Sequence, residues 1–214
     1  MSNLIIVEER TLENKKIQIR YDDNPWNPRE FEGNLGRMIC FYKRANLGDK
    51  HSYQNKDEFI YDLMQEAFGE KMAEEKIQKE NKESRTEMEA DDNLFKSISH
   101  KFIIRKLYLY EHSRITMSVN PFHCPWDGGI VGWICVDRDE AKKEYELLSS
   151  EIKAKKSINE WINERINGEV DIYDKYIKGE VYAYTLFEDD EVSDGCSGFF
   201  DIKDIYEEFP EFST

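Results

Sequence analysis

The chain has 214 residues, of which 35% are charged and 13% aromatic, and its formal net charge is −15 at pH 7. The aromatic content argues against a wholly disordered chain. The negative charge argues against direct binding to nucleic acid, because such a surface repels phosphates. No segment approaches the roughly 18 apolar residues of a membrane helix, and the N-terminus lacks the basic and long apolar regions of a signal peptide. We therefore expect a cytoplasmic protein that has no membrane partner and keeps its four cysteines reduced.

Short apolar runs typical of β-strands recur along the chain, separated by loops rich in Gly, Pro, Asn and Asp. The predicted strands cover residues 4–7, 16–21, 37–44, 102–110, 115–119, 133–136, 181–187 and 196–200. Ile115, Met117 and Val119 alternate with polar residues, which is the period of a half-buried strand. The first two runs are close enough in sequence to form a hairpin.

Three regions are predicted to be helical, at residues 57–68, 139–178 and 201–209. Within the second region, Ser157 and Glu160 have the spacing of a capping box. A glycine at position 179 is placed to end this region. The third region is short and acidic, but it also has an apolar face and should therefore fold.

Residues 70–93 contain few apolar side chains, although their Glu, Lys, Ala and Met residues favour helix. We interpret them as a charged helical insertion, which is either a solvated helix or a mobile excursion. The strands and the unequal helices do not follow the regular rhythm of parallel β-α-β units. We therefore predict the α+β class, with a mostly antiparallel sheet, flanking helices and this insertion, in a single domain of residues 1–214.

Negative charge is concentrated near the C-terminus. Residues 188–211 contain ten acidic residues and one lysine, which gives this stretch a net charge of −9 and leaves −6 for the other 190 residues. One interpretation is an acidic surface that only maintains solubility. The other is a contact surface for a protein with a basic patch. The candidate partner-binding residues are Glu188, Asp189, Asp190, Glu191, Asp194, Asp204, Glu207 and Glu208.

A second set of candidate residues lies in two regions rich in Gly, Pro and Trp, at 24–36 and 107–133. Their polar side chains could contact a small ligand, or could hold the loop backbone in place. The candidate ligand-binding residues are Arg29, Glu30, Asn34, His112, Ser113, Trp126 and Asp127. The turn at 46–51 could add Asp49 and His51 to such a site.

Two kinds of chemistry remain open for the region 107–133. His112, His123, Cys124 and Asp127 are all possible metal ligands, but their spacing matches no established zinc pattern. Cys124 or Ser113 beside a histidine could act as a nucleophile, but no nucleophile elbow is present. The chain also lacks a Walker phosphate loop, a dinucleotide GxGxxG motif and an HExxH motif. We therefore assign no catalytic residue, metal or cofactor.

Several stretches occur together in a fixed order: NPWNPREFEGNLGRMICFYKRANLGDKH, LYLYEHSRITMS, PWDGGIVGW, and EVYAYTLFE followed by DGCSGFF. The set resembles a group of uncharacterised proteins from bacteriophages, plasmids and conjugative elements. The chain differs from that group at Arg114, where the group tends to have glycine, and at Gly33, an extra residue in the first loop. The resemblance implies a mobile genetic element as the setting and no particular activity.

Two main hypotheses follow. Small acidic proteins of mobile elements often resemble inhibitors of host defence, including antirestriction and anti-CRISPR proteins, some of which imitate the charge of DNA. The first hypothesis is a non-enzymatic protein of the host cytoplasm that binds a basic surface of a host protein, such as a nuclease or CRISPR effector. The alternative is a small-ligand or nucleotide-binding protein, or an enzyme, with a site around His112, Asp127, Arg29 and Glu30. A structural role in phage assembly is a third possibility.

Overall fold

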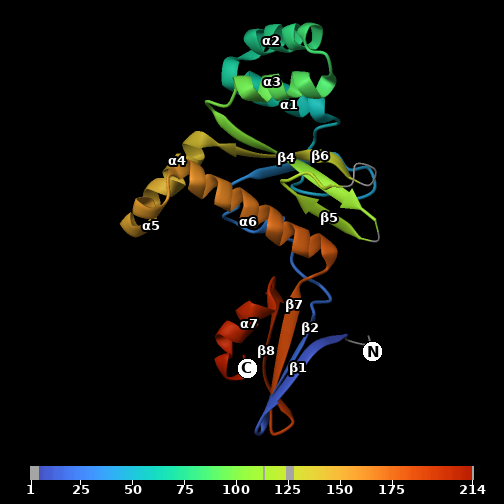
Figure 1. Cartoon of the computed structure of the whole chain (residues 1–214), viewed down its shortest axis with the longest axis vertical. Helices are drawn as coiled ribbons and strands as arrows, with labels where there is room; N and C mark the ends of the chain where they lie inside the picture. The colour runs from blue at the N-terminus through green and yellow to red at the C-terminus, as the bar shows by residue number, and fades with distance from the viewer. Residues whose placement is uncertain (1–4, 113, 124–127, 214) are drawn as a thin grey trace. The chain divides into compact units, whose positions relative to one another are not determined.

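The computed structural model describes residues 5–112, 114–123 and 128–213 (Figure 1). Within these residues, two antiparallel four-stranded sheets and seven α-helices form, which confirms the predicted α+β class. The chain divides into two compact units. The terminal unit comprises Met1–Glu32, Glu111–Met117 and Val170–Thr214, and the central unit comprises Gly33–Tyr110 and Ser118–Glu169.

The sheet of the terminal unit has the strand order β1-β2-β7-β8. Its strands are β1 (Ile6–Leu12), β2 (Lys15–Tyr21), β7 (Tyr182–Glu188) and β8 (Glu191–Phe199). β1 and β2 form the predicted N-terminal hairpin, and β2 pairs antiparallel with β7 so that Ile17 faces Leu186 and Ile19 faces Tyr184. The alternation in β2 places both isoleucines on one face, where they are fully buried.

One face of this sheet is covered by α7 (Ile202–Glu208) and the short 3₁₀ turn η2 (Pro210–Phe212), beside the sheet in Figure 1. Ile205 on α7 is fully buried against the sheet core. Asp201 caps the helix by accepting a hydrogen bond from the backbone N–H of Lys203 at 3.0 Å. The Arg10 guanidinium donates to the Phe212 carbonyl and lies 4.4 Å above the Tyr206 ring, which fixes the C-terminal turn to β1.

The second sheet has the strand order β3-β6-β4-β5. Its strands are β3 (Arg37–Cys40), β6 (Gly128–Asp137), β4 (Phe102–Glu111) and β5 (Ile115–Ser118). Three helices pack together in the central unit: α1 (Lys56–Phe68), α2 (Glu70–Glu83) and α3 (Glu87–Ser97). Phe59, Leu63 and Met64 of α1 share a buried core with Ile39 and Trp133 of the sheet.

Residues 70–93 form most of α2 and α3, with a short break between the helices. Figure 1 shows α2 on the outer side of this helical group. Ala73 is the buried residue of α2, and Ile77, one turn later, is partly buried against the same core. Ala90 and Leu94 have the same four-residue spacing on α3. A narrow apolar stripe is therefore enough to pack these charged helices.

The predicted helical region 139–178 forms three helices: α4 (Arg138–Leu147), α5 (Ser150–Lys155) and α6 (Ile158–Lys178). The capping box is present, because the Ser157 N–H donates to the Glu160 carboxylate at 2.8 Å. These hydrogen bonds lower the pKa of Glu160. α6 ends immediately before Gly179, as predicted. Its residues up to Glu169 belong to the central unit and the rest to the terminal unit.

Four strands differ from the sequence prediction by more than one residue. β1 covers Ile6–Leu12 and not 4–7, because the mostly polar residues 8–12 also pair with β2. β3 ends at Cys40 and not at residue 44, and β8 covers Glu191–Phe199 and not 196–200. β6 begins at Gly128, although its glycines predicted a loop. Gly132 is required there, because a Cβ would lie 2.0 Å from the Ile39 carbonyl oxygen of the neighbouring β3. The glycine thus permits close strand approach within a sheet.

Candidate functional site

The negative charge of the protein belongs mainly to the terminal unit. Its residues include 21 acidic and 9 basic side chains, for a net charge of −12, so the larger central unit carries only −3. The acidic surface of this unit consists of the turn between β7 and β8, the strand β8 and the helix α7.

The tip of this surface is the two-residue turn between β7 and β8. Asp189 and Asp190 have φ angles of 51° and 67°, and two positive φ values are what a type I′ hairpin turn requires. Aspartate tolerates this left-handed region better than most residues. The Asp189 N–H donates to the Asn14 carbonyl at 2.9 Å, and the Asn14 amide donates to the Asp189 carboxylate at 3.1 Å. Four consecutive carboxylates, at positions 188–191, are therefore held on an ordered tip.

The strand β8 and helix α7 add further carboxylates. β8 is an edge strand of its sheet, and all of it except Phe199 is exposed. On α7, the buried Ile205 faces the sheet while Asp204, Glu207 and Glu208 remain exposed. The amphipathic pattern that folds this helix therefore also presents its acidic residues to solvent.

Asp194 on β8 is exposed and also accepts a side-chain hydrogen bond. The Tyr184 hydroxyl donates to its carboxylate at 2.9 Å. Burial first, and then this hydrogen bond, raises the pKa of Tyr184 to about 12, and the negative charges of Asp194 and Glu208 add to the effect. Because both carboxylates act on one hydroxyl, β8 and the end of α7 present their charges in the same neighbourhood.

The predicted partner-binding residues share two properties. Each is exposed, and within the described part of the chain none forms an ion pair with a lysine, arginine or histidine. They are Glu188, Asp189, Asp190, Glu191, Asp194, Asp204, Glu207 and Glu208. The nearby Asp201 differs, because Lys175 lies 3.8 Å from its carboxylate. The surface therefore keeps most of its charge uncompensated.

The predicted ligand-binding residues do not all fall in the described structure. Arg29 and Glu30 lie in the 3₁₀ turn η1 (Pro28–Glu30), which Asn27 caps by accepting from the Arg29 N–H at 2.9 Å. His112 follows β4, and its N–H donates to the Arg114 carbonyl at 3.4 Å. Asn34 belongs to the central unit, whereas these other residues belong to the terminal unit. Ser113, Cys124, Trp126 and Asp127 lie outside the described residues.

A cavity of about 700 Å³, here called the loop pocket, lies in the central unit. It is lined by residues between Cys40 and Lys56 and by residues 130–133 of β6. The loop is tied to β3 by backbone and side-chain bonds: the Asp49 N–H donates to the Met38 carbonyl at 2.7 Å, and the Asp49 carboxylate accepts from the Met38 N–H at 2.8 Å. His51 Nε2 lies 2.9 Å from the Cys40 carbonyl.

The loop pocket includes the turn at 46–51 that the sequence marked as a possible addition to a site. Gly48 in this turn has a φ of 73°, and a Cβ there would lie 2.3 Å from the Met38 carbonyl oxygen. The charge of the loop is a further sequence signal for this pocket, and the sequence prediction did not use it. Residues 41–56 carry four basic side chains and one acidic one in a chain of net charge −15.

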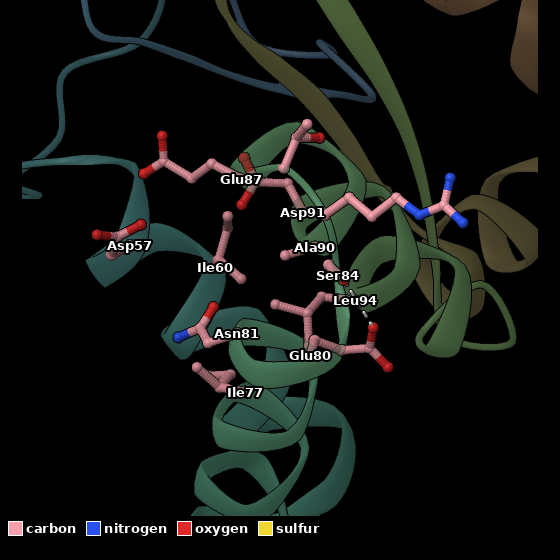
Figure 2. Close-up of a pocket in the computed structure, with 12 residues that line it drawn as sticks. Asp57, Ile60, Ile77, Glu80, Asn81, Ser84, Glu87, Ala90, Asp91 and Leu94 are labelled. Carbon is pink, nitrogen blue, oxygen red and sulfur yellow. Dashed lines mark hydrogen bonds between the residues drawn. The ribbon is translucent and has the colours of Figure 1, made fainter.

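A second hollow, of about 530 Å³, lies among α1, α2 and α3 (Figure 2). Ile60, Ile77 and Leu94 line its apolar part in Figure 2. Part of its acidic rim is paired locally, because Lys56 lies 2.6 Å from Asp91 and 3.4 Å from Glu87. Burial is the main cause that raises the pKa of Asp91, and it is opposed by Lys56. The hollow therefore has less uncompensated charge than the acidic surface.

No protein-family model, curated protein or solved structure matches the chain. Among the described residues, no helix has the length and apolar character to span a membrane. In the same residues, His, Cys, Asp and Glu side chains form no group of three or more that could hold a metal ion.

Proposed function

We propose that this protein is an accessory protein of a phage or mobile element that binds a basic surface of a host protein and thereby inhibits a defence system. The acidic surface of the terminal unit would make the contact in the host cytoplasm. The observation that carries the proposal is a set of eight exposed carboxylates on an ordered turn, strand and helix, none of which forms an ion pair with another described residue. The resemblance to proteins of mobile elements supports the setting.

The mechanism is electrostatic. Uncompensated carboxylates on a folded surface create a negative potential that speeds encounter with a lysine- and arginine-rich groove. A groove that normally binds nucleic acid, in a nuclease or a CRISPR effector, has this character, because phosphate contacts supply much of its affinity. The acidic surface would occupy the groove in place of the phosphates. The protein itself would not bind nucleic acid.

The test is affinity capture from a host lysate at low and high salt, followed by mass spectrometry. The variant D189N/D190G/E207Q/E208Q removes four charges from the acidic surface, and Asn-Gly is the preferred sequence for a type I′ turn. The control variant E74Q/E75Q/E144Q/E146Q removes four exposed charges from the central unit.

We expect the native protein and the control variant to retain a basic, nucleic-acid-binding host protein at low salt and to lose it at high salt. The acidic-surface variant should fail to retain it even at low salt. Capture by that variant with unchanged salt dependence would overturn the proposed mechanism.

A further inference from the structure

We infer that the loop pocket is a binding site for a small anionic ligand with a planar ring, of the chemical class of a nucleoside monophosphate. The inference is independent of the proposed function, because the pocket belongs to the central unit and the acidic surface to the terminal unit. The volume, about 700 Å³, lies within the range of roughly 300–1,000 Å³ that is typical of small-molecule sites.

The pocket is held in shape by the protein itself. Asp49 bonds to the backbone of Met38 in both directions, and His51 bonds to the Cys40 carbonyl. Gly48 and Gly132 allow the loop and β6 to approach the backbone of β3 more closely than any side chain would permit. A ligand would therefore enter a preformed cavity and would not have to order a loose loop, which favours binding.

Aromatic side chains supply the surface for a planar ring. The rings of Phe41 and His51 have centroids 5.2 Å apart, and His51 is 5.5 Å from Tyr53. Phe41 also contacts Trp133, with centroids 6.3 Å apart. Phe41, His51 and Tyr53 are partly exposed in the pocket lining, whereas Trp133 is buried in the core and supports Phe41. Aromatic walls of this kind stack on nucleobases and similar rings, and stacking tolerates different bases.

Positive charge supplies the preference for an anion. Lys43, Lys50 and Lys56 line the pocket, and Asp49 is its acidic residue. The Asp49 carboxylate accepts a backbone hydrogen bond from Met38. Lys56 pairs with both Asp91 and Glu87 outside the pocket lining, so we assign the phosphate contact to the exposed Lys43. Lysine ammonium groups bind phosphate as point charges.

Two wall residues also have unsatisfied buried atoms. His51 Nδ1 and Trp133 Nε1 have no hydrogen-bond partner in the described part of the structure. The contact of His51 Nε2 with a carbonyl requires the proton on Nε2, so Nδ1 is an acceptor in the neutral ring. Unpaired buried polar groups cost free energy. Both atoms are shielded from solvent, so we assign neither of them a contact with the ligand.

The experiment is isothermal titration calorimetry of the full chain with three classes of probe. Nucleoside monophosphates carry ring and phosphate, the matching nucleosides lack the phosphate, and inorganic phosphate lacks the ring. We expect the monophosphates to bind and each of the other two classes to bind at least roughly tenfold more weakly, because each lacks one of the two recognised groups. A nucleoside or inorganic phosphate that binds as well as the monophosphate would overturn the proposal, as would no binding of any monophosphate at millimolar concentration.

Two variants locate the site. K43Q removes one exposed lysine of the pocket, and K71Q removes an exposed lysine of α2 as the matched control. We expect K43Q to weaken monophosphate binding roughly fivefold and K71Q to leave it unchanged. Equal affinity for K43Q and the native protein would overturn this location. The acidic-surface variant of the previous test should bind the monophosphate normally, so the two proposals fail separately.

Discussion

The acidic surface of the terminal unit and the loop pocket of the central unit differ in the sign of their charge and in their exposure. The first places carboxylates on a turn, an edge strand and a short helix, where they are exposed and form no ion pairs among the described residues. The second places lysines and aromatic rings around a cavity whose loop is bonded to β3. An exposed charged surface suits a macromolecular partner, whereas a bonded cavity suits a small molecule.

In the loop pocket, the close approach of β3 and β6 is the feature that we expect to be most sensitive to substitution. G132A would place a Cβ 2.0 Å from the Ile39 carbonyl oxygen, so the strands must separate. We expect a loss of roughly 4 kcal/mol in the free energy of unfolding, or failure to fold. Urea denaturation measures this loss. G129A is the control, because a Cβ there meets nothing within 4 Å, and its stability should be nearly native.

The acidic surface depends on a different contact, the packing of α7 on its sheet. Ile205 is fully buried there, so I205A should lower the free energy of unfolding by about 3 kcal/mol through lost apolar contact and a cavity. V192A on β8 is the control, since Val192 is 67% exposed. Amide hydrogen exchange should show faster exchange in α7 for I205A. Unchanged protection of α7 would show that the helix does not need this anchor.

The turn at the tip of the acidic surface gives a smaller effect of opposite sign. D189N/D190G replaces two aspartates at positive φ with the preferred turn sequence and removes two neighbouring charges. We expect the free energy of unfolding to rise by about 1 kcal/mol, measured by thermal denaturation. E188Q/E191Q also removes two charges but keeps the turn residues. A similar gain from this second pair would attribute the effect to charge repulsion and not to backbone conformation.

These two regions were not equally predictable from the sequence. The acidic surface rests on local features, namely a run of carboxylates and the apolar spacing of Ile202, Ile205 and Phe209, so its residues could be named in advance. The loop pocket joins Phe41 to Trp133, which are 92 positions apart. Local sequence patterns do not show that two residues so far apart in the chain line the same pocket.

The strand β6 shows why the pocket was missed. Its start, GGIVG, has the composition of a loop, because glycine is rare within strands. Gly132 is nevertheless part of the strand for a tertiary reason, the close approach of the Ile39 carbonyl. The register of Ile39 opposite Trp133 then brings the indole to the pocket wall. A preference for loop was overridden by the pairing of two distant segments.

The two units also differ in their expected response to alkaline pH. In the central unit, burial raises the pKa of Cys135 from 9.0 to about 12. In the terminal unit, burial and the bond to Asp194 raise the pKa of Tyr184 from 10.0 to about 12. Each folded unit holds its proton more tightly than the unfolded chain does. The stabilisation is therefore complete below the lower value of each pair and is lost as the pH rises through the higher value.

It follows that the central unit should begin to lose stability near pH 9 and the terminal unit near pH 10. Amide hydrogen exchange across a pH series, corrected for the intrinsic rate, follows each unit separately. C135A should remove the loss that begins near pH 9 from the central unit and leave the loss caused by Tyr53, whose pKa burial also raises to about 12. Y184F should reduce but not abolish the later loss in the terminal unit, because burial raises the pKa of Tyr206 to about 12 as well, and it should change the stability by about 0.5 kcal/mol at neutral pH. If both units lose protection together in the native protein and in both variants, these two groups do not control the alkaline response.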